Sequence, residues 1–130
     1  MQYEQFLARV RDRGEYASAE EAAHVTAAVL EVLSSRITPQ EAAGLAAQLA
    51  RPLQPAVDTD PERVAGTFGV EEFLRRVAER VGGRPRTAEW DASAVLTTLA
   101  EAVSGGELNH LISELPSGYA ALFGEFALSD

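Results

Sequence analysis

The only two histidines of the chain each follow a glutamate by three residues. Glu21 and His24 lie in the stretch EAAH, and Glu107 and His110 lie in ELNH. Two Glu-x-x-His motifs on two helices, joined by one glutamate from each of two further helices, form the carboxylate-bridged di-metal sites of helical bundles. The first question that this sequence raises is therefore whether these four residues bind metal.

A second interpretation gives the same glutamates a structural role. In a capping box, a serine or threonine hydroxyl accepts a first-turn N–H, and a glutamate three residues later reaches back to the cap. The sequence contains three such pairs, which are Ser18 with Glu21, Thr38 with Glu41, and Ser104 with Glu107. Both histidines fall beside the apolar stripes of their helices. We therefore expect capping glutamates, solvent-facing histidines and no metal site.

The sequence also contains an internal repeat. Residues 3–13 (YEQFLARVRDR) match residues 70–80 (VEEFLRRVAER), at an offset of 67 from 3 to 70. After a one-residue adjustment in a loop, AVL at 28–30 matches AVL at 94–96, and the offset becomes 66. Loops absorb such insertions and helices do not, so this pattern is typical of a duplicated unit. The two Glu-x-x-His motifs fall at non-equivalent places in the repeat, which is a second argument against a duplicated metal site.

Apolar residues recur with a helical period throughout both copies, which predicts three helices in each. A further stripe of Tyr119, Leu122, Phe123 and Phe126 predicts a short closing helix after Pro116. The fold class is therefore all-α: a compact helical bundle of two tandem homologous three-helix units, each followed by a short closing segment. We expect one domain with repeat one at 1–57, a linker at 58–69 and repeat two at 70–130, because neither half is large enough to be stable alone.

Charge and composition exclude several classes of function. The net charge of -9 argues against nucleic-acid binding, which requires a basic surface. The absence of cysteine excludes disulfides, thiolate metal sites and cysteine nucleophiles. No apolar run approaches the length of a membrane span or of a signal peptide, so we expect no membrane association and a cytoplasmic location.

Catalytic signatures are absent or incomplete. GTFG at 66–69 and VGG at 81–83 lack the spacing of nucleotide-binding loops. DTDPE at 58–62 resembles the start of a calcium loop, but Arg63 stands where that loop needs glycine. A serine triad has no credible base when both histidines face solvent. We therefore expect no enzymatic activity and no cofactor.

Two features could instead mark a contact surface. Five arginines crowd together just before an acidic last third that contains no basic residue; they are Arg75, Arg76, Arg80, Arg84 and Arg86. Such a patch could pair with the acidic third of a second molecule or of the same one, or it could be an ordinary solvated surface. Trp90 is the only tryptophan, a residue type enriched at interfaces, although core packing is the commoner role.

The sequence resembles a known family. The stretches YEQFLARV, AVLEVLSSRIT, EEFLRRVAER, AVLTTLAEAVSGGEL and ELPSGYAALFG are similar to the bacterial family called domain of unknown function 2267, over nearly the whole chain and in both copies. Copy one departs from the LPSGYAALF ending, because Ala50 replaces the proline and Pro55 interrupts the expected closing helix. The resemblance implies a compact, duplicated, all-α domain, with no assigned activity or functional residues.

These observations lead to two functional hypotheses. The first is a non-enzymatic protein-interaction module, whose partner is another protein or a second copy in a homo-oligomer. Its first candidate residues are the five arginines and Trp90. The alternative is a helical domain that binds a small ligand in a pocket between the two repeats, since interfaces of this kind often contain clefts.

Overall fold

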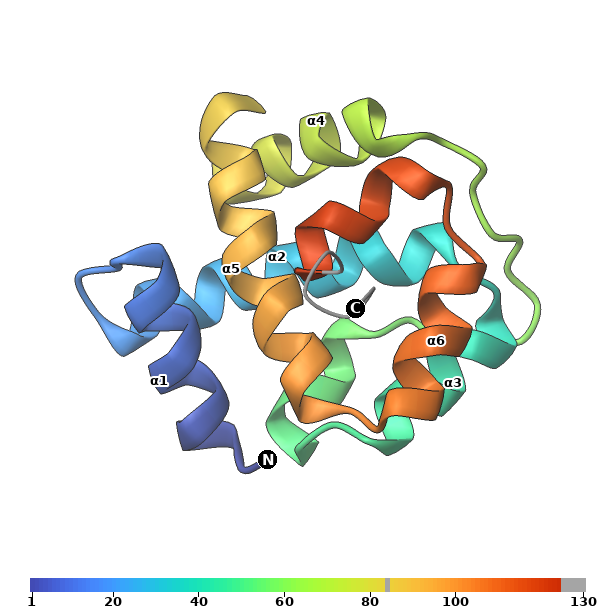
Figure 1. Ribbon diagram of the computed structural model, residues 1–130, viewed down its shortest axis with the longest axis horizontal. Coiled ribbons are helices and arrows are strands. Elements are labelled where there is room, and N and C mark those ends of the chain that lie inside the picture. Colours follow the sequence, from blue (N-terminus) through green and yellow to red (C-terminus); the bar gives the residue numbers. More distant parts are fainter. Residues whose placement is uncertain (84, 125–130) are drawn as a thin grey trace.

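The computed structural model describes residues 1–83 and 85–124, with the backbone alone at residues 85 and 86. These residues form six α-helices and two 3-10 helices and contain no strand, so the protein is all-α as predicted (Figure 1). The elements in chain order are α1 (Tyr3–Gly14), α2 (Ala19–Arg36), α3 (Pro39–Ala47), η1 (Arg51–Ala56), α4 (Val70–Val81), α5 (Pro85–Ala102), α6 (Gly105–Ser113) and η2 (Ser117–Phe123).

Local signals explain where several helices begin and end. Ser18, Thr38 and Ser104 each accept a hydrogen bond from the backbone N–H three residues on, at the starts of α2, α3 and α6. Such caps satisfy N–H groups that have no partner inside the helix. Helix α4 ends at Gly82, whose φ of 85° is accessible to glycine at little cost.

Each predicted closing segment forms a 3-10 helix. Pro55 was expected to interrupt the segment of copy one, yet η1 spans it. The helix tolerates this proline because the hydrogen bonds on either side, from Leu53 N–H to Ala50 O and from Val57 N–H to Gln54 O, do not use its missing N–H. In η2, Tyr119 is fully buried, which confirms a packed closing helix. Phe126 lies outside the described residues.

The two long helices, α2 and α5, carry the core. Each contacts α1 and α4 as well as the other (Figure 1). Leu30 and Leu33 of α2 and Leu96 and Leu99 of α5, which are 66 residues apart in pairs, are fully buried. The described helices include none that is long and apolar enough to cross a membrane.

The segment between η1 and α4, residues 57–69, is tied to the bundle. Arg36, at the end of α2, donates to Phe68 O at 2.7 Å and to Gly66 O at 3.0 Å. Arg63 donates to Ile37 O at 2.9 Å. Arginine side chains thus satisfy backbone carbonyls of an irregular segment that has no regular structure of its own. The division into repeats and linker stays a prediction.

Helices α3 and α6 lie side by side at one end of the molecule (Figure 1). Each has only nine residues, a length at which an isolated helix is marginal in water. Their stability therefore depends on what they contact, and their interface contains the candidate site.

Candidate functional site

The two Glu-x-x-His motifs do not meet. Glu21 and His24 lie at the start of α2, whereas Glu107 and His110 lie on α6, at the opposite side of the molecule (Figure 1). Both histidines are exposed as predicted, and the His110 side chain retains 83% of its accessible surface. In residues 1–83 and 85–124 no group of three or more acidic, histidine or cysteine side chains is placed to hold a metal ion.

The capping box of α2 forms almost as predicted. Glu21 N–H donates to Ser18 Oγ at 3.0 Å. In return, Glu21 Oε1 accepts from Ala17 N–H at 2.9 Å, one residue before the cap and not at the cap itself. The Glu21 carboxylate is therefore occupied by local structure.

In the other two capping boxes, only one of the two expected hydrogen bonds forms. Thr38 Oγ1 accepts from Glu41 N–H at 3.1 Å, but Thr38 donates its own N–H to Glu114 Oε1, also at 3.1 Å. Likewise, Ser104 Oγ accepts from Glu107 N–H at 3.1 Å. The expectation that Glu41 bonds back to its own cap is therefore wrong, because a residue from another helix has taken that position.

Helices α3 and α6 cap each other. Glu114 is the C-cap of α6 and bonds to the N-cap of α3, while Gln48 is the C-cap of α3 and bonds to the N-cap of α6. The second contact consists of Ser104 N–H donating to Gln48 Oε1 at 2.7 Å and Gln48 Nε2 donating to Ser104 Oγ at 3.3 Å. Helices α3 and α6 are therefore antiparallel, and the C-cap side chain of each helix bonds to the N-cap residue of the other.

This arrangement leaves two glutamates free to face each other. Glu41 and Glu107, which the repeat places at equivalent positions, come within hydrogen-bonding reach across the interface. Glu41 is only 7% exposed. Burial raises its pKa to about 8, with further contributions from the hydrogen bond to Glu107 and from the negative charges of Glu107 and Glu114. Glu41 therefore carries a proton at neutral pH.

The residues that flank this carboxyl pair differ on its two sides. A Cβ atom at Gly44 would lie 3.2 Å from Glu107 Oε1, so the glycine leaves room for the Glu107 carboxyl against α3. The position 66 residues later is His110, whose Nδ1 lies 3.5 Å from Glu41 Oε1. One carboxyl thus lies against a bare backbone and the other beside an exposed imidazole.

A cavity of about 320 Å³ opens at this interface. It is lined by Thr38, Gln40, Glu41, Gly44, Glu107, His110 and Glu114. The Oε2 atoms of Glu41 and Glu107 are buried and accept no hydrogen bond from the residues that the structure describes. Leaving a buried acceptor unpaired costs about 1–3 kcal/mol, so the proton that Glu41 retains is the donor available to join the pair.

The three arginines of the predicted patch whose side chains the structure describes all pair with carboxylates of the same molecule. Arg75 pairs with Glu72 at 2.6 Å and with Glu79 at 2.8 Å, and Arg76 also pairs with Glu72, at 2.8 Å. These two guanidinium groups lower the pKa of Glu72 to about 2. Arg80 pairs with Glu31 of α2 at 2.9 Å.

Two members of the patch are not described at the level of side chains. Arg84 lies outside the described residues, and the side chain of Arg86 is likewise not described. Of the other three, Arg76 also lies with its guanidinium carbon 3.9 Å from the Phe68 ring centroid. Each described guanidinium group of the patch thus has a carboxylate partner in the same molecule.

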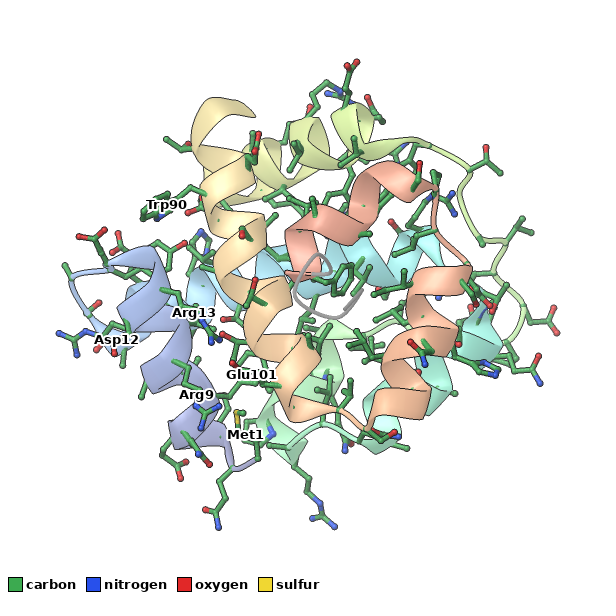
Figure 2. The ribbon with its side chains drawn as sticks, viewed as in Figure 1. Met1, Arg9, Asp12, Arg13, Trp90 and Glu101 are labelled. Carbon is green, nitrogen blue, oxygen red and sulfur yellow. The ribbon has the colours of Figure 1, made fainter. Side chains whose placement is uncertain are left out.

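Trp90 lies on the outer side of α5, near the end of α1 (Figure 2). It is 52% exposed, and its Nε1–H donates to Gly14 O at 3.0 Å. Of the two roles that the sequence leaves open for Trp90, core packing is wrong, because its position beside the apolar stripe of α5 leaves the side chain half exposed. Farther along α5, Arg9 and Arg13 of α1 point toward Glu101 (Figure 2) and pair with it at 2.9 and 2.6 Å.

A family model described as "Uncharacterized conserved protein (DUF2267)" matches residues 3–122. The chain belongs to this family. The search of curated proteins finds no match. Membership in DUF2267 confirms the resemblance seen in the sequence and brings no functional residues with it, so the site must be argued from geometry.

The sequence singles out both glutamates of this candidate site, but the capping pattern predicts the wrong partners for their carboxylates. Glu41 and Glu107 were interpreted as capping residues on a local pattern that all three boxes share. The available signal was that these two glutamates are equivalent in the repeat, and equivalent residues often meet where two similar units pack together. Trp90, the other candidate residue, is half exposed, and its indole N–H donates to Gly14 O.

Proposed function

We propose that this protein is a ligand-binding helical domain whose ligand occupies the cavity between α3 and α6. The observation that carries the proposal is the Glu41 and Glu107 pair in the wall of a cavity, where the Oε2 atom of each carboxyl is buried and has no hydrogen-bond partner among the described residues. Perturbed titratable groups gathered at a concave surface are typical of functional sites. The alternative hypothesis from the sequence, a pocket between the two repeats, therefore has more support than the first.

Binding is proposed in preference to catalysis. A protonated carboxyl beside a second carboxyl could exchange a proton with a bound molecule, but the lining residues provide no serine or cysteine nucleophile. The proposal therefore keeps the expectation that the protein is not an enzyme.

A fragment screen followed by amide chemical shifts tests this proposal. In the blocked variant, Gly44→Leu, a side chain grows toward Glu107 and fills the cavity. The matched control, Ala43→Leu, places the same side chain at an exposed neighbouring position outside the cavity lining. We expect fragments that shift amides of α3 and α6 in the wild type and the control, and not in the blocked variant. Fragments that bind the blocked variant equally well would contradict the proposal.

A second candidate function is the interaction module, and the exposed indole of Trp90 favours it. The test is the oligomeric state of the wild type and of Trp90→Ala, measured by native mass spectrometry at low and moderate salt. A dimer that the substitution dissociates supports this candidate. A variant in which Arg75, Arg76 and Arg80 are all replaced by serine examines the patch separately. We expect it to change association little, because these charges are already paired.

A further inference from the structure

The cavity between α3 and α6, called here the acidic cavity, carries an excess of negative charge. Its titratable groups are Glu41 from α3, Glu107 and His110 from α6, and Glu114 at the α6 C-cap. The remaining described lining residues, Thr38, Gln40 and Gly44, have no titratable side chain. The described lining therefore contains no arginine. A ligand that complements this cavity must therefore be positively charged.

The buried carboxyl oxygens specify more than charge. Glu41 is more than nine-tenths buried and forms part of the cavity wall, and its Oε2 lacks a hydrogen-bond partner among the described residues. The Oε2 of Glu107 is in the same condition. Once the proton that joins the pair has left, both oxygens are acceptors, so a matching ligand must present N–H donors and not only charge. A guanidinium or primary ammonium group does so, and a guanidinium matches two carboxylate oxygens at once.

An organic cation fits the acidic cavity better than a metal ion does. Metal sites need several ligands at fixed distances, and the described residues offer no such group of three. Both oxygens of Glu114 accept hydrogen bonds from Thr38. The volume of about 320 Å³ is at the small end of ligand pockets, which suits a head group with a short chain.

We propose that the acidic cavity binds a small organic cation bearing N–H donors, a guanidinium or a primary ammonium, and that binding releases to solvent the proton held between Glu41 and Glu107. This inference rests on the proposed function and specifies its ligand class. The released proton is the one that joins the two carboxyls in the free protein, and the N–H groups of the ligand replace it. Affinity therefore rises with pH until the pair has lost its proton.

The test uses n-propylguanidinium as the probe, because its charge does not change in the pH range of interest. The matched probe n-propylurea has nearly the same shape and also carries N–H groups, but it is neutral. Each is titrated into the full ¹⁵N-labelled chain at pH 6.5 and pH 8.0, at constant ionic strength, and amide shifts at residues 38–44 and 104–114 are followed.

We expect saturable shifts with n-propylguanidinium, with a Kd about tenfold lower at pH 8.0 than at pH 6.5, as the release of one proton by a group of pKa about 8 requires. Glu107→Gln weakens binding at least tenfold, and Glu41→Gln removes the pH dependence. The control Glu21→Gln, at the same helical position of α2, changes neither. A free amine and a lysine or arginine side chain share this chemistry. Equal affinity for an acetylated arginine amide indicates that a protein side chain could be the natural source.

Four results would overturn the inference. Equal binding of n-propylurea would show that the site does not select a positive charge. A Kd independent of pH in the wild type would show that binding does not release the shared proton. If neutral or anionic fragments shift the same amides while n-propylguanidinium does not, the cation class is wrong and the ligand-binding function survives. If no probe of any charge gives saturable shifts at α3 and α6, both fail.

Discussion

Replacing Glu41 by glutamine should make the protein more stable at alkaline pH. The folded protein holds a proton on Glu41 that the unfolded chain loses above its ordinary pKa of 4.5, whereas the folded pKa is about 8. The stabilisation from this group is therefore complete below pH 4.5 and is lost as the pH rises to about 8. Glutamine keeps the shape of the protonated carboxyl and does not titrate.

The magnitude follows from the size of that change. Each pKa unit corresponds to about 1.4 kcal/mol, so the wild type should lose about 5 kcal/mol over the whole window and about 3 kcal/mol between pH 5.5 and pH 8. Glu41 is almost fully buried, so solvent screens this term little. Loss on this scale is a large share of the 5–15 kcal/mol that stabilises a typical domain.

The assay is urea denaturation followed by far-ultraviolet circular dichroism, at half-unit steps from pH 5.5 to pH 8.5 and constant ionic strength. The wild type and Glu41→Gln should have similar free energies of unfolding at pH 5.5 and diverge as the pH rises. The matched control is Glu21→Gln, whose difference from the wild type should stay constant. Parallel curves for the wild type and Glu41→Gln would refute the shared proton.

Three further predictions concern other contacts. Tyr119→Phe should lower the free energy of unfolding by about 1–2 kcal/mol, because the Tyr119 hydroxyl donates to Phe68 O at 2.9 Å, and equal urea midpoints would contradict this. Arg13 lowers the pKa of Glu101, so the stability lost in Glu101→Gln should be under about 1 kcal/mol near neutrality and vanish as the pH falls through that pKa in acid titrations. The fluorescence of Trp90, the only tryptophan, should be quenched strongly by acrylamide in the folded protein; weak quenching would show that the indole is covered, as in an oligomer.

The helices could be predicted because their signals are local. Apolar residues three and four positions apart mark the buried face of each helix, and hydroxyl residues at Ser18, Thr38 and Ser104 mark three starts. The matching stretches at 3–13 and 70–80, each the first of three predicted helices in its copy, agree with α1 and α4 to within one residue. Leu33 and Leu99 are in the core for the same reason, since helical period alone assigns them to the apolar stripe.

Side-chain partners from distant parts of the chain were predicted less well. The arginine patch was recognised from its density along the sequence, but the pairing of Arg80 with Glu31 joins residues 49 positions apart. For Trp90 the sequence leaves core packing and a contact surface both open, and the side chain is half exposed, with its indole N–H donating to Gly14 O, 76 residues away. Neither the Arg80–Glu31 pair nor the exposure of Trp90 can be predicted from the spacing of neighbouring residues.

The sequence by itself determined that this chain forms helices, where most of them begin, and which faces they bury, since hydrogen bonds and apolar periods within a helix involve residues at most four positions apart. Only the tertiary structure decided what Glu41 and Glu107 do. The same capping pattern, a hydroxyl residue followed three positions later by a glutamate, is present at α2, α3 and α6, and only at α2 does the glutamate bond back to the start of its own helix. Because α3 and α6 pack antiparallel, Gln48 and Glu114 reach the caps of the opposite helix, and the two displaced glutamates meet in the wall of a cavity.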